Sequence, residues 1–285
     1  MRQSNGYVIF FTAILTVVVG GAMALTSVAL RPAQQKSIEL DTKSQILGAV
    51  TDVSAMKNKE VLSFYDEHIS SLVVNIKGDE VEGEVAEKVN VNKQFRNLFK
   101  AQKKRREAGK LTQLADRTGD EEAKAEAAKL IEEAEAIEAD ALFPVFKYSA
   151  ESGDAIDAYI FPVYGNGLWN NIFGYVALEN NLNEIKGVSF GHVGETPGLG
   201  ARITTEEVKA RFAGKTIFDE SGDLVSVTMV KGEGNPESAL GPHKVDGMSG
   251  ATLTANGLNE MLDAYLHYYL NYIGKNKSGE VQAAL

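Results

Sequence analysis

The sequence predicts an α+β protein in which one N-terminal transmembrane helix precedes a soluble domain with an antiparallel or mixed sheet, flanking helices and a helical insertion. Three observations predict this class. The chain opens with about two dozen uncharged residues, its second half holds short β-rich segments separated by turn signals, and a long amphipathic segment follows the last of them.

The composition is that of a folded protein. Of the 285 residues, 44% are hydrophobic and 24% are charged, which suffices for one good-sized domain or two small ones. The formal net charge of -10 argues against a nucleic-acid partner. The chain has no cysteine, which excludes disulfides, a catalytic thiol and a Cys-ligated iron–sulfur cluster on this chain.

Residues 7–30 carry no charge and are long enough to cross a bilayer of about 30 Å at about 1.5 Å per residue. Arg31 and Pro32 are expected to close this span, after a short tail at residues 1–6. A cleaved signal peptide is the competing interpretation, because Ala22-Met23-Ala24 resembles a cleavage site. The apolar run continues to Leu30, which favours an anchor. Basic residues flank both ends, so the positive-inside rule does not orient the span.

Residues 31–56 are expected to form a helical stalk, and residues 57–275 the soluble domain, with a C-terminal tail at 276–285. Inside the domain, residues 95–142 are rich in Ala, Glu and Lys and predict two helices. Thr118 and Glu121 match a capping box for the second of them. This insertion is either a solvated helical hairpin or a docking surface for a partner protein.

The rest of the domain is expected to be β-rich. Another capping box, Thr204 with Glu207, predicts a short helix that ends before Gly214, and an amphipathic helix is expected at residues 254–273, ending at Gly274. The expected strands are residues 71–77, 157–164, 172–179, 185–193 and 224–231.

Motifs of several common activities are incomplete. Gly214-Lys215-Thr216 resembles the end of a P-loop, but Lys209 stands where its first glycine belongs. There is no G-x-G-x-x-G after a strand and no G-x-S-x-G elbow. The four histidines are scattered. His192 and Glu195 could form a pair of site residues, but structural or solvent-exposed roles are favoured for them. No metal site and no catalytic residue are predicted.

Three glycine-rich stretches remain as candidates for one site. They are Gly165-Asn166-Gly167-Leu168-Trp169, Gly194-Glu195-Thr196-Pro197-Gly198-Leu199-Gly200, and Asp246-Gly247-Met248-Ser249-Gly250-Ala251-Thr252. Each taken alone is an ordinary turn, and Pro197-Gly198 predicts a tight one. The third precedes a helix, and free backbone N–H groups at a helix N-terminus favour a phosphate.

Asp246-x-x-Ser249-Gly250-Ala251-Thr252 resembles the flavinylation motif D-x-x-[ST]-G-A-T of the FMN-binding domain family. The other two stretches and the layout of one N-terminal span before a soluble domain are also similar to that family. Its members include the C subunit of the Na⁺-translocating NADH:quinone reductase and the G subunit of the Rnf complex. The chain length and the stalk look closer to the former, whereas residues 95–142 resemble the family least.

The resemblance implies a covalent FMN, joined by a phosphoester to the Thr252 hydroxyl by a flavin transferase that uses FAD. Asp246 would help this modification. The resemblance further implies that the cofactor-binding residues are Thr252, Ser249, Gly250, Ala251, Asp246, Glu195, Thr196, Gly198, Leu199, Gly200, Trp169 and Leu168.

The resulting hypothesis is an electron-transfer subunit of a Na⁺-pumping NADH:quinone oxidoreductase in a bacterial inner membrane, with its domain in the periplasm. It would work with the other subunits of that complex and bind neither NADH nor quinone itself. The G subunit of the Rnf complex is the alternative within the family. A membrane-tethered binding or scaffold domain without a cofactor is the alternative outside it.

Overall fold

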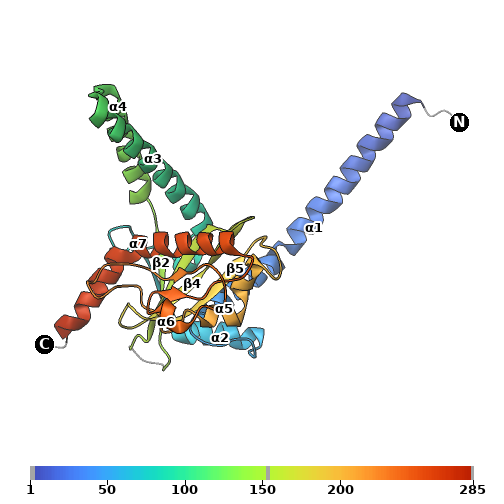
Figure 1. Cartoon of the computed structure of the whole chain (residues 1–285). Coiled ribbons are helices and arrows are strands. Elements are labelled where there is room, and N and C mark those ends of the chain that lie inside the picture. The colour runs from blue at the N-terminus through green and yellow to red at the C-terminus, as the bar shows by residue number, and fades with distance from the viewer. Residues whose placement is uncertain (1–3, 152–154, 284–285) are drawn as a thin grey trace.

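The computed structural model describes residues 4–151 and 155–283, and Figure 1 shows two long arms rising from an α/β body. One arm is the N-terminal helix and the other is a helical hairpin. The helices, in chain order, are α1 (Asn5–Leu47), α2 (Asn58–His68), η1 (Ala86–Lys88), α3 (Val91–Thr118), α4 (Glu121–Ala139), η2 (Gly200–Thr204), α5 (Glu206–Ala210), α6 (Glu237–Leu240) and α7 (Thr252–Ala283).

The body is built on a five-stranded antiparallel sheet in the order β1-β2-β3-β4-β5, with a separate two-stranded parallel pair, β6-β7. The predicted fold class is therefore confirmed. The strands are β1 (Ile69–Val74), β2 (Phe143–Tyr148), β3 (Ala158–Asn166), β4 (Asn171–Glu179), β5 (Ile185–His192), β6 (Thr228–Met229) and β7 (Lys244–Val245).

Both faces of the sheet are covered, which explains why β3 is buried along nearly its whole length. Alternate side chains of a strand point to opposite faces. Phe161 and Val163 pack in the larger core with α7, and Ile160 packs in a second core with the end of α1 and with α2. The amphipathic pattern of the last helix is confirmed, because all seven positions are buried: Leu258, Met261, Leu262, Tyr265, Leu266, Tyr269 and Ile273.

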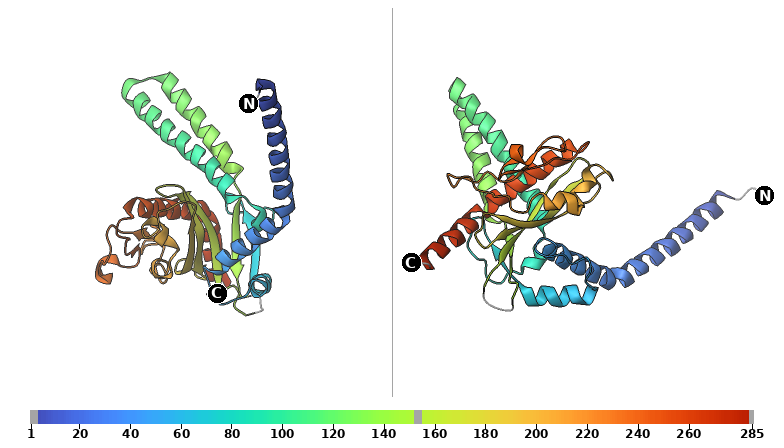
Figure 2. Two further views of the ribbon diagram at one scale, coloured as in Figure 1. Left: turned by 90° about the vertical axis from the view of Figure 1, so that its right-hand side faces the viewer. Right: turned by 60° about the horizontal axis from the view of Figure 1, so that its bottom comes forward.

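Arg31 and Pro32 end the uncharged run, and helix α1 continues past them into the predicted stalk as far as Leu47. Proline removes one helical hydrogen bond and bends a helix without necessarily ending it. Figure 2 shows α1 bent along its length. The helix is long and apolar enough to cross a membrane, and the side chains of its apolar window are exposed. Burial begins only at its end, where Ile46 and Leu47 enter the second core.

Helices α3 and α4 pack as an antiparallel hairpin on small side chains. Alanines at seven-residue spacing on α3 face alanines on α4, and their methyl groups allow the two backbones to approach closely. Ion pairs from Lys104 to Glu133 and from Arg105 to Glu138 flank this seam. The buried alanines are Ala101, Ala108, Ala115, Ala123, Ala127 and Ala134.

The capping box predicted for α4 was wrong. Thr118 is the last residue of α3, and its hydroxyl donates back to the Leu114 carbonyl. The N-cap is Asp120, whose Oδ1 accepts from the backbone N–H groups of Glu122 (3.0 Å) and Ala123 (3.1 Å). Gly119 takes φ of 73° and ends α3, so the second helix begins two residues later than a Thr118 cap requires.

Asp120→Ala is expected to destabilise the start of α4 by about 1 kcal/mol, because two backbone N–H groups lose their acceptor. Thr118→Ala is the matched control and should change little, because the Thr118 hydroxyl donates only to the Leu114 carbonyl within α3 and contacts nothing in α4. Amide hydrogen exchange at residues 121–126 measures both. Loss of protection in Thr118→Ala, with Asp120→Ala unchanged, would restore Thr118 as the cap.

Three further expectations about element boundaries were wrong. The short helix is preceded by Thr205, not by a Thr204 side-chain cap, because the Thr204 hydroxyl donates to the Ala201 carbonyl. Only Thr228–Met229 of the expected strand at 224–231 is extended in a sheet, since Ser226 has φ of 58°. Helix α7 passes through Gly274, its expected end, and continues to Ala283.

Candidate functional site

The three glycine-rich stretches converge on one cavity of about 310 Å³ at the end of the sheet nearest the start of α7. The first stretch is the turn between β3 and β4, the second follows β5, and the third precedes α7. The cavity is lined by Leu168, Trp169, Glu195, Thr196, Leu199, Gly200, Gly250, Ala251, Thr252, Leu253 and Thr254.

The second and third stretches form matching tight turns. The Thr196 carbonyl accepts from the Leu199 N–H (3.1 Å) around Gly198, whose φ is 75°. The Met248 carbonyl accepts from the Ala251 N–H (3.2 Å) around Gly250, whose φ is 76°. Glycine adopts positive φ without strain, so the predicted turn at Pro197-Gly198 is confirmed.

The two turns also lie against each other, although the positive φ of Gly250 is what requires a glycine there. A Cβ built on Gly250 would lie 2.8 Å from Leu199 Cδ2, closer than van der Waals contact allows. Leu199 remains 41% exposed and Leu253, on the first turn of α7, is 60% exposed. Together they present an apolar surface beside the Thr252 hydroxyl.

Trp169 forms the opposite wall. The β3–β4 turn is closed by a hydrogen bond from the Gly167 N–H to the Asn170 carbonyl (2.8 Å). The Trp169 indole N–H donates to Thr196 Oγ1 (3.1 Å), which ties the ring to the second turn. The residue is nevertheless 69% exposed, so its indole is available to a ligand in the cavity.

Glu195 is the buried centre of the site, with only 4% of its surface exposed. Its carboxylate accepts from the Thr254 hydroxyl (2.5 Å) and from the Trp169 backbone N–H (2.9 Å). Burial alone would raise the pKa of Glu195, but these donors and the Asn170 backbone N–H stabilise the anion and hold the pKa below its ordinary value.

Two glycines leave room for this carboxylate. A Cβ on Gly200 would lie 2.4 Å from both Glu195 Oε2 and Thr254 Oγ1, and one on Gly167 would lie 2.5 Å from Glu195 Oε1. His192 supports the same loop, since its Nδ1 accepts from the Glu195 backbone N–H (3.2 Å). The His192–Glu195 pair is therefore structural.

Asp246, Ser249 and Gly198 lie outside the cavity lining, although the resemblance implied that they bind the cofactor. Asp246 instead holds the loop that precedes α7 by hydrogen bonds. Its carboxylate accepts from the backbone N–H groups of Gly234 (2.7 Å) and Gly247 (3.0 Å) and from the Asn235 side chain (2.7 Å). These donors outweigh partial burial and lower the pKa of Asp246.

A second brace on this loop consists of Glu233, Arg202 and Arg211. Glu233 pairs with both arginines and accepts from the Ser249 backbone N–H (3.2 Å), and these contacts lower its pKa strongly. Arg211 also donates to the carbonyl groups of Asp246 (3.2 Å) and Gly247 (2.5 Å). Sequence reasoning missed this brace because these residues stand 16 or more positions from Ser249 and match no motif.

Leu253 and Thr254 were also absent from the expected site. Both lie within two residues of Thr252, and the first turn of a helix turns successive side chains through about 100°. Leu253 therefore faces the cavity mouth and Thr254 its floor, where it holds Glu195. A motif that ends at Thr252 gives no signal for either.

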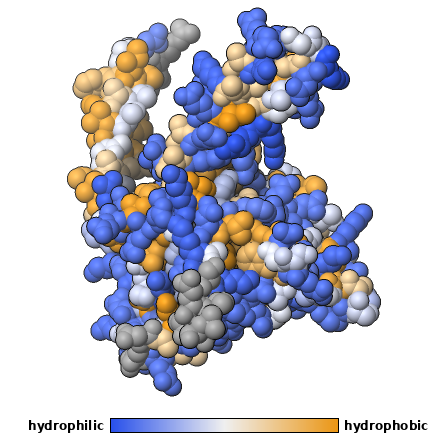
Figure 3. Space-filling view, turned by 90° about the vertical axis from the view of Figure 1, so that its left-hand side faces the viewer, coloured by the Kyte–Doolittle hydropathy of each residue, from blue (hydrophilic) through white to orange (hydrophobic). Residues whose placement is uncertain are grey.

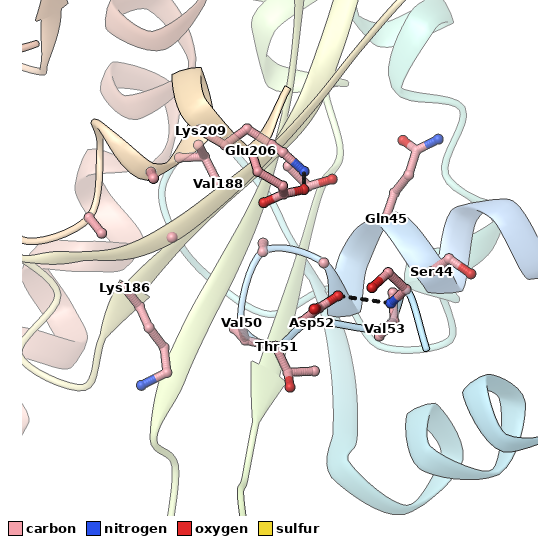
Figure 4. A pocket seen from close by; sticks show the side chains of 17 residues that line it. Ser44, Gln45, Val50, Thr51, Asp52, Val53, Lys186, Val188, Glu206 and Lys209 are labelled. Atoms are coloured by element: carbon pink, nitrogen blue, oxygen red, sulfur yellow. Dashed lines mark hydrogen bonds and ion pairs between the residues drawn. The ribbon is translucent and has the colours of Figure 1, made fainter. Parts of the chain in front are cut away.

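A larger cavity, of about 410 Å³, lies between residues 44–54 and the β5–α5 region (Figure 4). Its two lysines already have partners, because Lys186 pairs with Glu179 and Lys209 pairs with Glu206. None of the three glycine-rich stretches reaches this cavity. The smaller cavity is therefore the candidate site.

Comparisons with known proteins agree with this geometry. The FMN-binding domain profile matches residues 167–267, which contain all three walls of the cavity. The C subunit of the Na⁺-translocating NADH-quinone reductase from Vibrio campbellii is 33% identical over 267 residues, covering 93% of this chain and 90% of that protein. The Pseudomonas aeruginosa protein of the same name is 29% identical and covers 93% of this chain and 92% of that protein.

Solved structures give the same result. The crystal structure of the C subunit of the Na⁺-translocating NADH-quinone reductase from Parabacteroides distasonis superposes with a TM-score of 0.61 at 28% identity, covering 86% of this chain and 96% of that chain. A Shewanella oneidensis structure, at 23% identity and a TM-score of 0.58, shares the fold. The chain belongs to the family of C subunits of the Na⁺-translocating NADH-quinone reductase and contains an FMN-binding domain.

Proposed function

We propose that this chain is an electron-transfer subunit of a Na⁺-translocating NADH:quinone oxidoreductase and holds FMN in a phosphoester on Thr252. The observation that carries the proposal is the position of Thr252. It begins α7 at the edge of a cavity whose other walls come from two distant loops of an FMN-binding domain.

The residues of the cavity fit a flavin. A flat isoalloxazine ring needs apolar faces, and Leu168, Trp169, Leu199 and Leu253 are 41–69% exposed around the opening. Exposed apolar side chains that cluster at the mouth of a cavity are typical of a ligand-binding site. A cavity of about 310 Å³ is at the lower limit for a cofactor site, which suits a ligand retained by a covalent bond.

The start of α7 fits the phosphate. The first backbone N–H groups of a helix have no intrahelical acceptor and lie at the positive end of the helix dipole. Thr252 is the first residue of this 32-residue helix, so a phosphate on its hydroxyl would lie beside those groups. Gly250 and Ala251 leave this approach open to another protein.

The flavin would be attached to Thr252 by a group transfer from FAD. The Thr252 hydroxyl oxygen would bond to the riboflavin-side phosphorus of FAD, the pyrophosphate bond would break, and AMP would leave. The hydroxyl proton would pass to a base on the flavin transferase or to water. Asp246 and Glu233 would contribute by fixing the loop, because both bind its backbone.

Bound FMN would supply reversible electron uptake, and the chain would supply position and electrostatics. The anionic Glu195 carboxylate beneath the cavity opposes additional negative charge there, and Trp169 and Leu199 would supply apolar contacts to a bound flavin. The donor and acceptor would be cofactors of other subunits, and this chain would turn over neither NADH nor quinone alone.

Helix α1 would anchor the chain in a bacterial inner membrane, with the domain in the periplasm. Its length, apolar composition and exposed side chains support the anchor. The orientation rests on the family resemblance. The Rnf alternative is less favoured, because relatives matched over 93% of this chain are C subunits of the Na⁺-translocating reductase.

The full chain made together with its flavin transferase is expected to fluoresce under ultraviolet light after denaturing electrophoresis, since only a covalent flavin survives denaturation. In the folded protein, flavinylation should quench Trp169, which lies in the cavity wall and is the only tryptophan. Protein made without the transferase is the control. A dark band from co-produced protein would favour the cofactor-free scaffold alternative.

A further inference from the structure

The outer face of α3 is strongly basic, although the chain as a whole carries a formal net charge of -10. Helix α3 holds nine Lys and Arg residues against two acidic ones, whereas α4 holds seven Glu residues against two Lys. Within the hairpin, Lys104 and Arg105 of α3 bind Glu133 and Glu138 of α4. The remaining basic residues of α3 are directed elsewhere.

Six of these residues are exposed and form one stripe. At about 100° per residue, they fall within an arc of about 120° whose centre lies about 120° from the buried alanines, and the exposed Glu107 is the one acidic residue of α3 in that arc. Among the residues that the structure describes, none of the six forms an ion pair. They are Lys93, Arg96, Lys100, Lys103, Lys110 and Arg117.

Two large apolar side chains belong to the same face. Phe99 is 48% exposed and Leu114 is 38% exposed. Leu114 lies four residues after Lys110 and three before Arg117, so it stands among the basic residues. Phe99 lies at the base of the hairpin, where it also lines a cavity with Met261 and Tyr265 of α7. Lysines and arginines interleaved with exposed apolar side chains are typical of helices that lie on an anionic membrane surface.

The hairpin can reach the membrane that α1 would cross. Figures 1 and 3 show both arms extending from the upper part of the body, and the right-hand view of Figure 2 shows that they diverge. The arm formed by α3 has 28 residues, or about 42 Å. The part of α1 from Arg31 to Leu47, which separates the apolar span from the body, is only about 25 Å long.

We propose that the basic stripe of α3 docks on the anionic phospholipid headgroups of the bilayer that holds α1. This inference rests on the membrane anchoring proposed above. Charge complementarity selects the headgroups, and Leu114 enters the interface beneath them. Because α1 keeps the hairpin close to the bilayer, a weak contact suffices to hold it there. Docking at a second point restricts rotation of the domain about the stalk and limits the directions in which the flavin site faces.

The test uses the full chain in vesicles with one label on the hairpin. The sequence contains no cysteine, so Gln113→Cys accepts a thiol-reactive fluorophore at a single exposed position beside Leu114. The vesicles are phosphatidylcholine, with or without phosphatidylglycerol, and both contain a lipid with a nitroxide quencher on its headgroup. Quenching is expected in the anionic vesicles, and high salt should abolish it.

The combined variant Lys100→Gln, Lys103→Gln, Lys110→Gln should lose the docked population, by about five-fold for each lysine removed. The matched variant changes three exposed lysines outside the hairpin, Lys59→Gln, Lys231→Gln and Lys244→Gln, and should keep it. Covalent flavin fluorescence and flotation with the vesicles, measured on the same samples, should be unchanged in both variants and report separately on the proposed function and anchor.

Three results would overturn the proposal. The first is equal quenching in neutral and anionic vesicles. The second is an equal loss in the two triple variants, which would indicate an effect of net charge only. The third is a protected label that requires the other subunits and not the anionic lipid, which would assign the stripe to an acidic protein surface.

Discussion

Thr252→Val is expected to abolish the covalent flavin completely while leaving the domain folded. Valine keeps the shape of threonine and lacks the hydroxyl that would bond to phosphorus. Because Thr252 is only partly buried at the first position of α7, the substitution should change the free energy of unfolding by less than about 1 kcal/mol. Intact mass spectrometry of protein made with the transferase measures this. The wild-type chain should gain the mass of FMN minus one water, and the variant should not.

Three control variants define the acceptor. Thr252→Ser restores a hydroxyl at the same position and should recover at least part of the adduct. Ser249→Ala should retain the adduct, because the structure engages Ser249 through its backbone N–H, which alanine preserves. Thr254→Val should retain it too, since the Thr254 side chain is buried and faces Glu195. An adduct on Thr252→Val that disappears in either of the last two variants would move the acceptor there.

The sequence was most informative where short-range chemistry decides the structure. Gly198 and Gly250 need positive φ, and both turns occur where the motifs place them. The apolar spacing from Leu258 to Ile273 predicted the buried face of α7, because side chains three and four apart lie on one side of a helix. Each of these features depends on a few neighbouring residues.

Features that depend on distant partners were missed or misplaced. Strand β2 was not expected, because Pro144 weakens a strand pattern, yet β2 pairs with β1 and β3 from opposite sides. The arginines that hold Glu233 come from η2 and from the residue after α5. Only folding brings them to the loop that precedes α7.

Glu195→Ala is expected to be the most destabilising single change in the site, by about 3 kcal/mol, although Glu195 is a charged residue in a loop. The substitution removes a buried acceptor and leaves the Trp169 N–H and the Thr254 hydroxyl without their partner. Glu195→Gln keeps the volume and one acceptor oxygen and should cost about 1–2 kcal/mol. Val193→Thr, at a position on the same loop that is 59% exposed, is the control and should stay within about 0.5 kcal/mol.

The pH dependence of these variants separates the charge of Glu195 from its shape. The pKa of Glu195 is lowered in the folded state, so its anion stabilises the fold above the unfolded-state value of about 4.3. That contribution disappears as the pH falls through the folded-state pKa. The difference in free energy of unfolding between wild type and Glu195→Gln should therefore be largest near neutral pH and shrink in acid. Urea unfolding followed by circular dichroism measures it, with Trp169 fluorescence as the local signal. A difference that is constant down to the acid limit would show that Glu195 acts through packing alone, and would remove it as a source of negative charge beneath the flavin.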